Sequence, residues 1–263
     1  MDLGIRDRVA VVAASSRGLG RAVAEALAAE GVRVALCARD PDALAGTARG
    51  IQERSGTEVF YQALDVTNPA AVKTFVDATL DRFGRVDIGV ANAGGPPSKS
   101  FAATSVDDWR HAFDLNFMST LYLVRELLPH MQRQKWGRLV AITSMTAKQP
   151  VDGLVLSNAI RAAVTGLMKS LANEYGRDNI LVNCVCPGYT ATDRLVQVAK
   201  AHAAAQGVPA EQIVARWTQN IPLGRLGRPE EFAALVAFLC SEHAGYITGS
   251  STAIDGGYVK GIY

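Results

Sequence analysis

The sequence lacks the charge imbalance, the long apolar runs and the leader pattern that indicate a nucleic-acid-binding, membrane or exported protein. Its 27 lysine and arginine residues stand against 25 aspartate and glutamate residues, a net charge of +2, which is too small to favour nucleic acid or an anionic lipid surface. No apolar run approaches the roughly 18 residues of a membrane-spanning helix. The first residues lack the basic head and apolar stretch of a signal peptide. We therefore expect neither a nucleic-acid nor a membrane partner.

Cysteine and histidine are also scarce, with four of each in 263 residues. The cysteines form no Cys-x-x-Cys pair and lie in apolar runs, and the histidines have no zinc-like spacing. This pattern predicts no disulfide and no metal site, and it favours the reducing cytoplasm as the location. We expect core positions for Cys37, Cys184, Cys186 and Cys240, and surface or helix-end positions for His111, His130, His202 and His243.

Apolar residues make up 49% of the sequence, and they occur in short β-branched runs that alternate with longer amphipathic segments. The expected strands are residues 8–13, 32–37, 58–63, 86–91, 137–143, 180–186 and 251–254, the first three buried. The expected helices are residues 19–30, 41–54, 69–83, 106–134, 154–175 and 229–239. Continuous apolar strands joined by helices are typical of a parallel sheet covered on both faces. We predict one α/β domain over residues 1–263, of the Rossmann-type doubly wound class, with a mostly parallel seven-stranded sheet.

Residues 190–222 break this alternation, because they carry no strand pattern between the sixth strand and the last helix. Their apolar residues, among them Leu195, Ile213 and Trp217, predict one or two short helices. Insertions that follow the carboxyl ends of strands lie where open α/β sheets bind ligands. We expect a substrate lid here, and the alternative is a pair of surface helices without that role.

A glycine-containing loop follows the first expected strand and leads directly into a helix. Its residues are Ser15, Ser16, Arg17, Gly18, Leu19 and Gly20. Backbone N–H groups at a helix start, with no side chain at the glycines, form a pyrophosphate site in such folds. A Gly-x-Gly pair is a weak signal alone, but its place at the first strand-to-helix turn makes it much stronger. We expect this loop to bind the phosphates of a dinucleotide.

The end of the second strand indicates which dinucleotide. Arg39 stands where an acidic residue would favour a free ribose 2′-hydroxyl, and Arg17 lies in the phosphate loop. Two guanidiniums near one phosphoester form forked, charge-assisted hydrogen bonds. We predict NADP(H) as the cofactor, and the alternative is that both arginines lie over solvent-facing turns.

Several motifs resemble, in the right order, those of the classical short-chain dehydrogenase/reductase family. The phosphate loop is similar to that family's Thr-Gly-x-x-x-Gly-x-Gly, and Ile254-Asp255-Gly256-Gly257 resembles its closing strand. The other matching residues are Asp65, Val66, Asn92, Ala93, Gly94, Asn116, Ser144, Pro187, Gly188, Thr190 and Thr192. The resemblance covers essentially the whole chain.

The resemblance implies roles for these residues. Asp65 and Val66 would contact adenine, residues 92–94 would border the cofactor, and residues 187–192 would lie over the nicotinamide carboxamide. Asn116 and Ser144 would belong to the catalytic site. The layout is most similar to 3-oxoacyl-carrier-protein reductases, which implies a small carbonyl or alcohol compound as substrate. It also implies a homotetramer that pairs through the helices 106–134 and 154–175.

The phosphate loop departs from the family pattern at its start, where Ala13-Ala14 replaces Thr-Gly. A Cβ at position 14 makes a positive φ costly and narrows the turn. Gly18 and Gly20 still allow close approach of a phosphate. We expect binding to survive, with a weaker or shifted loop.

The catalytic pair departs further. The family's Tyr lies 13 residues after its catalytic Ser, which from Ser144 is Ser157, and its Lys lies four residues later, which is Arg161. No tyrosine occurs between Tyr122 and Tyr175, so a shifted motif does not restore the pair.

Ser157 and Arg161 change what such a site can do. A phenol titrates near pH 10 and is tuned toward neutrality by a cation, whereas a serine hydroxyl is a far weaker acid on a shorter side chain. Arginine keeps the charge but does not deprotonate, and losing one general acid slows a reaction by about two to four powers of ten. Three functions stay open. They are a carbonyl reductase whose proton comes from water, Ser144 or the substrate; a non-catalytic NADP(H)-binding sensor or partner subunit; and a lyase or isomerase on the same scaffold.

Overall fold

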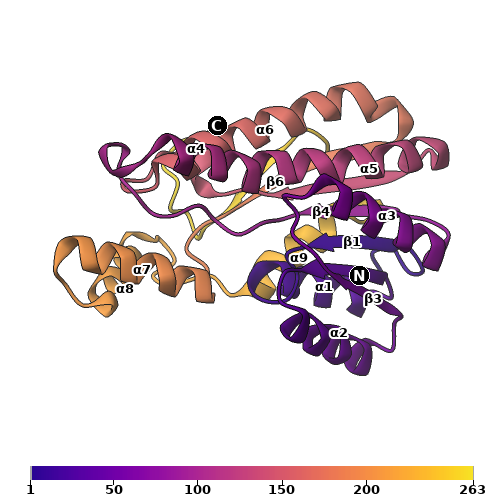
Figure 1. The fold of residues 1–263 in the computed structure, drawn as a ribbon, viewed down its shortest axis with the longest axis horizontal. Coiled ribbons are helices and arrows are strands. Elements are labelled where there is room, and N and C mark those ends of the chain that lie inside the picture. The colour runs from indigo at the N-terminus through magenta and orange to yellow at the C-terminus, as the bar shows by residue number, and fades with distance from the viewer. Residues whose placement is uncertain (1, 263) are drawn as a thin grey trace.

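Across residues 2–262, the part of the chain that the computed structural model describes, seven parallel strands form one sheet in the order β3-β2-β1-β4-β5-β6-β7 (Figure 1). The strands are β1 Val9–Ala13, β2 Arg33–Ala38, β3 Val59–Ala63, β4 Ile88–Ala91, β5 Gly137–Ile142, β6 Ile180–Pro187 and β7 Ser251–Ile254. Neighbouring strands are parallel at every pairing between them. The predicted doubly wound sheet is therefore confirmed, and it is parallel throughout rather than mostly.

Helices cover both faces of the sheet (Figure 1). One layer contains α1 (Gly18–Ala29), α2 (Pro41–Ser55) and α9 (Pro229–Leu239), and the other contains α3 (Pro69–Phe83), α5 (Ser119–Gln134) and α6 (Val155–Tyr175). Each layer buries its apolar stripe in a separate core: Leu27, Leu44 and Phe232 belong to one, Phe75 and Leu127 to the other. The central strands of the sheet are continuously apolar in sequence because helices cover both of their faces.

The remaining helical elements are shorter or lie outside these layers. They are α4 (Val106–Phe113), the π-helical turn η2 (Asp114–Met118), α7 (Asp193–Gln206), α8 (Ala210–Asn220), and the 3₁₀ turns η1 (Phe101–Ala103), η3 (Met145–Ala147), η4 (Gly176–Asp178) and η5 (Glu242–Ala244). Within residues 2–262, no helix is both long and apolar enough to cross a membrane.

Local sequence explains where α2 and α3 begin. The Asp40 side chain accepts a hydrogen bond from the Ala43 N–H, and Asn68 accepts from the Ala70 and Ala71 N–H groups. Pro41 and Pro69 follow these caps at the first helical position, where the missing N–H costs nothing. The sequence signals were strong here, so the predicted starts at Pro41 and Pro69 match the structure.

Two expectations about the elements were wrong. Residues 106–134 do not form one helix, because α4 ends at Phe113 and the wider turn η2 separates it from α5. The strand expected to be buried at residues 58–63 is the edge strand β3, which pairs only with β2, and its Tyr61 is 47% exposed. An apolar run does not reveal how many neighbours its strand has, so the sequence did not distinguish an edge from a centre.

The segment 190–222 forms the expected pair of helices, α7 and α8, which stand apart from the layers (Figure 1). It has an apolar core of its own, in which the rings of Tyr189 and Trp217 stack with centroids 4.6 Å apart. His202 meets the Trp217 ring edge-on at 5.7 Å. His202 is therefore half-buried in the middle of α7, which corrects the expectation of a surface or helix-end residue.

The other scarce residues lie close to where the sequence placed them. All four cysteines are buried, as predicted, and burial raises the pKa of Cys37, Cys184 and Cys240 to about 12. His111 and His243 are exposed. These thiols are therefore small core residues and stay protonated at neutral pH.

The strand order determines where a ligand binds. The chain runs from β1 outward to β3 and then returns to β4, which lies beside β1. Such a reversal is a topological switch point, and ligands of open α/β sheets bind outside the carboxyl ends of the strands there. The loops that follow β1, β4, β5 and β6 meet at this edge.

Candidate active site

The loop after β1 is fastened to the end of β2. The Ser15 N–H donates to the Cys37 carbonyl at 3.1 Å, and the Ser15 hydroxyl donates to the same oxygen at 3.3 Å. The Thr47 hydroxyl of α2 donates to the Ser16 carbonyl at 2.9 Å. The loop is therefore held from two sides before α1 begins.

The start of α1 is open to an anion. Arg17 is the N-cap residue, its side chain makes no capping hydrogen bond, and no acidic residue lies in the first turn. The N–H groups at Gly18 and Leu19 therefore point out of the helix without a side-chain acceptor. Unsatisfied N–H groups and the helix dipole together favour a phosphate at this end.

The turn itself is tight. A Cβ at Gly20 would lie 2.4 Å from the Ala14 carbonyl oxygen and 2.7 Å from Asn92 Nδ2, so no larger residue fits. Ala14 adopts a φ of +49°, the left-handed region that costs an L-residue roughly 1–2 kcal/mol. The loop thus has the backbone shape that glycine adopts easily, and Ala14 occupies the position with the strained, positive φ.

Basic and acidic residues follow β2 and β3 at one end of this edge. Arg17 and Arg39 are both exposed, and they lie two residues after Ser15 and Cys37, respectively, which are hydrogen-bonded to each other. The Thr67 N–H donates to Asp65 Oδ1 at 2.9 Å and is the main cause that lowers the pKa of Asp65, and the charge of Arg39 lowers it further. Val66 lines a small cavity behind this loop.

Two asparagines connect the loop after β4 to its surroundings. Asn92 Nδ2 donates to the Ala14 carbonyl at 3.3 Å. Asn116, in the π-helical turn, donates its Nδ2 to the Gly94 carbonyl at 2.7 Å, and its buried Oδ1 has no partner among residues 2–262. Ala93, between the two contacts, is half-buried. A buried acceptor without a donor requires a further partner, and π-turns occur frequently at functional sites.

Three hydroxyl groups gather after β5. The Thr146 N–H donates to Ser144 Oγ at 3.1 Å, and Thr146 Oγ1 lies 2.9 Å from Ser157 Oγ in the first turn of α6. Asn158 fastens the intervening loop, because its side chain bonds both the N–H and the carbonyl of Val151. Ser144 Oγ accepts in this arrangement, and its hydroxyl also carries one hydrogen that can be donated.

Arg161 lies one turn beyond Ser157 and is only 7% exposed. Its Nη1 donates to the Ile142 carbonyl at 3.0 Å, and its Nε is buried without a partner in the part of the chain that the structure describes. Burial, followed by the charge of Arg194, lowers the pKa of Arg161 to about 10. The guanidinium therefore remains charged at neutral pH, at the carboxyl end of β5.

The segment after β6 crosses back toward the phosphate loop. Pro187 ends β6, and the Gly188 N–H donates to the carbonyl of Ile254, the last residue of β7, at 3.0 Å. Thr190 bridges to the segment before α9. Thr192 caps α7, and its Cγ2 would lie 3.8 Å from a Cβ at Gly18. Residues 187–192 therefore span from the sheet to the start of α1.

The predicted residues thus form two groups along the carboxyl edge of the sheet. The first contains the loop after β1 with Arg39, Asp65 and Val66, and the second contains Asn116, Ser144, Ser157 and Arg161. Arg39 and Asp65 follow β2 and β3 and lie far across the sheet order from Ser144 after β5. Within residues 2–262, no group of three or more His, Cys, Asp or Glu side chains is arranged to hold a metal ion.

Sequence reasoning missed two residues of this region. Thr146 lies two positions after Ser144, so its nearness to Ser144 was visible, but its bond to Ser157 depends on how the loop folds back. Arg194 of α7 donates its Nη2 to the Pro96 carbonyl at 2.5 Å, across 98 positions of sequence. No local signal marks that contact.

Comparisons with known proteins agree with this architecture. The pattern of the family described as Enoyl-(Acyl carrier protein) reductase matches residues 13–259. The 3-oxoacyl-[acyl-carrier-protein] reductase FabG of Aquifex aeolicus is 33% identical over 257 residues, covering 98% of this chain and 99% of that protein. The monensin polyketide synthase putative ketoacyl reductase of Streptomyces virginiae is 36% identical over 255 residues, covering 95% and 96%.

A solved structure is similar over its full length. The L-sorbose reductase from Gluconobacter frateurii, complexed with NADPH and L-sorbose, has a TM-score of 0.93 and 35% sequence identity, with 100% of both chains covered. The chain therefore belongs to the short-chain dehydrogenase/reductase family. The three relatives are all reductases by name.

Proposed function

We propose that this protein is an NADP(H)-dependent carbonyl reductase with an atypical catalytic pair, in which Ser157 and Arg161 stand where the family has Tyr and Lys. One observation carries the proposal. The buried Arg161 donates to the Ile142 carbonyl at the end of β5 and lies one helical turn after Ser157, whose hydroxyl is 2.9 Å from that of Thr146, at the edge where this fold class binds its ligands. Full-length similarity to named reductases supports the reaction class.

The residues present fit a bound NADP(H). The uncapped start of α1 and the side-chain-free Gly20 suit a pyrophosphate, and exposed Arg17 and Arg39 suit a ribose 2′-phosphate. The residues that would hold the rest are Ser15, Ser16, Gly18, Leu19, Asp65, Val66, Asn92, Ala93, Gly94, Arg161, Pro187, Gly188, Thr190 and Thr192. When bound, the cofactor supplies a hydride. The NADPH complex of L-sorbose reductase supports this choice.

The chain's own residues provide the polar half of the reaction. The hydroxyl of Ser144 donates to the carbonyl oxygen of the substrate and orients it. The Arg161 charge stabilises the negative charge that develops on that oxygen, and it acts strongly because the site is buried. The proton that completes the alcohol comes from water through the Thr146 and Ser157 hydroxyls. Asn116 holds the loop after β4 in place.

A second function, NADP(H) binding without turnover, is favoured by the same substitution. A serine at position 157 removes the phenol, and losing one general acid lowers the rate by about two to four powers of ten. The phosphate loop and the arginines do not depend on that acid, so cofactor binding would persist in a protein that reduces nothing.

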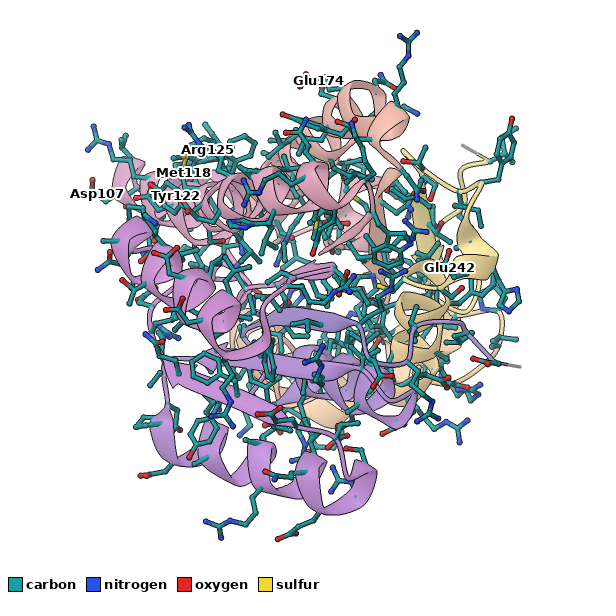
Figure 2. All side chains as sticks on the ribbon, turned by 90° about the vertical axis from the view of Figure 1, so that its right-hand side faces the viewer. Asp107, Met118, Tyr122, Arg125, Glu174 and Glu242 are labelled. Atoms are coloured by element: carbon teal, nitrogen blue, oxygen red, sulfur yellow. The ribbon has the colours of Figure 1, made fainter. Side chains whose placement is uncertain are left out.

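We also propose roles for the outer parts of the chain. Residues 190–222 act as a lid over the substrate, within a single domain of residues 1–263. The protein forms a homotetramer in the cytoplasm through α4, α5 and α6. Met118, Tyr122 and Arg125 lie together at one outer edge of the molecule (Figure 2), and the nearby Val106 and Phe113 are exposed apolar residues. A partner helix would cover these side chains.

Oxidation of NADPH against a panel of ketones tests the proposed function. We expect turnover of at least one ketone and a fall of about a hundredfold for Ser144→Ala. Ser170→Ala is the matched control, because Ser170 is an exposed serine of α6 whose hydroxyl donates to the Gly166 carbonyl of the same helix. The activity of this variant should be unchanged. Tight NADPH binding without turnover would favour the second function. Absence of NADPH binding would refute both.

A further inference from the structure

Two arginines from distant parts of the chain lie at the same end of the site. Arg161 comes from α6, and Arg194 comes from the first turn of α7. A Cβ at Gly95 would lie 2.9 Å from both Nε and Nη2 of Arg194, and Nη2 donates to the Pro96 carbonyl. The Arg194 guanidinium therefore lies against the loop after β4, where only a residue without a side chain leaves it room.

Both guanidiniums lie at the carboxyl ends of the neighbouring strands β4 and β5, since Arg194 bonds the loop after β4 and Arg161 bonds the Ile142 carbonyl at the end of β5. After burial, the charge of Arg194 is the next cause that lowers the pKa of Arg161, and burial lowers the pKa of Arg194 as well. Among residues 2–262, neither arginine forms an ion pair with a carboxylate. Positive charges at one site without a counter-charge are unfavourable, and here Arg161 is buried and Arg194 is half-buried.

Their hydrogen-bonding capacity is also largely unused. Each guanidinium carries five N–H donors in a fixed fork. In the described part of the chain, the side chain of Arg161 donates only to the Ile142 carbonyl and that of Arg194 only to the Pro96 carbonyl. Arg161 Nε is buried without any acceptor. Neutral ribose hydroxyls accept some of these bonds but do not offset two positive charges.

We propose that Arg161 and Arg194 together bind a carboxylate of the substrate, so that the substrate is a small carbonyl compound with an acidic group, an oxo acid. This rests on the proposed function and names its substrate class. A carboxylate accepts two parallel N–H bonds from a guanidinium and supplies the missing negative charge. Arg161 also faces the reacting oxygen, so Arg194 is the residue that determines specificity for the acid.

Binding of two matched probes tests the proposal. The full-length protein is saturated with NADP⁺, so that no hydride is available, and is titrated by calorimetry with acetoacetate and with its methyl ester. We expect acetoacetate to bind at least tenfold more tightly than the ester, about 1.4 kcal/mol. Arg194→Met should remove this preference, and Arg194→Lys should restore part of it, because lysine keeps the charge without the fork.

A control variant and a second affinity make the result specific. Arg216→Met removes an exposed arginine of α8 that bonds Gln206, and it should leave the preference unchanged. The affinity for NADP⁺ should be the same in the wild type and in Arg194→Met. An equal affinity of the wild type for acid and ester overturns the proposal. A parallel loss of NADP⁺ affinity in Arg194→Met also overturns it, because Arg194 then serves the cofactor. Failure of the proposed function is seen separately, as absent NADP⁺ binding or absent ketone turnover.

Discussion

The hydroxyl of Ser157 lies 2.9 Å from the hydroxyl of Thr146, which comes 11 residues earlier in the chain. Thr146 in turn bonds Ser144 through its backbone N–H, so the three small polar side chains of Ser144, Thr146 and Ser157 form one hydrogen-bonded cluster between β5 and α6.

Restoring the family pair tests whether the site is a reductase without its acid. We expect the double change Ser157→Tyr with Arg161→Lys to raise NADPH-dependent ketone reduction by about a hundredfold. The phenol supplies the proton, and the ammonium lowers its pKa. Either change alone should have little effect on the rate. A tyrosine without the lysine keeps the high pKa of a phenol, and a lysine without the tyrosine has no phenol whose pKa it can lower. Steady-state rates across a ketone panel measure this.

Two other outcomes of the same experiment are informative. A fall of the native reaction in the double variant would indicate a different mechanism, in which Ser157 leaves room for the substrate. Rapid turnover by the unmutated protein would refute the view that the hydroxyl cluster is a weak site.

Cofactor preference follows from the two exposed arginines. We expect NADPH to bind at least tenfold more tightly than NADH, about 1.4 kcal/mol, because only NADPH carries a phosphate for Arg17 and Arg39. Arg39→Asp should remove the preference. Arg49→Asp, an equal change of charge at an exposed position of α2, should preserve it. Fluorescence titration measures both ligands, and equal affinities in the unmutated protein would contradict the assignment.

The strained turn at Ala14 predicts a stabilising substitution. Ala14 has a φ of +49°, so Ala14→Gly should raise the free energy of unfolding by about 0.5 to 1 kcal/mol, after allowing for the greater freedom of glycine in the unfolded chain. Ala45→Gly, in the interior of α2, should lower it by about the same amount. Denaturant unfolding of both variants measures the sign of each change in the free energy of unfolding. A lower free energy of unfolding in both variants would show that Ala14 carries no strain.

The helices α7 and α8 should open more readily than the sheet. Their core, which includes Ile213 and Trp217, is separate from the two cores that cover the sheet, so local opening disrupts only that cluster. Hydrogen exchange in the free protein should be faster in residues 190–222 than in β5 and β6. Protection should rise there with NADPH and a ketone. Full protection without ligands would instead favour a static interface element.

Much of the fold was predictable because its determinants are local. Capping residues such as Asp40 and Asn68 mark helix starts within a few positions, and apolar runs mark strands that are buried on both faces. The place of the phosphate loop was also predictable from its position in the chain. In a doubly wound sheet, a glycine turn between the first strand and the first helix lies at the carboxyl edge of the sheet. For these features the nearest neighbours in sequence are the neighbours in space.

Other features depend on which distant segments meet, and only the tertiary structure decided them. Tyr61 is exposed because β3 is an edge strand, which its composition does not reveal. The π-helical turn divides an otherwise continuous helical pattern around Asn116. Arg194 reaches Pro96 across 98 positions, and its charge lowers the pKa of Arg161. The sequence by itself determined the alternation of strands and helices, the parallel sheet and the identity of the residues at positions 157 and 161. The environment of those residues was decided by packing, because burial and the nearness of two charges are properties of the assembled chain.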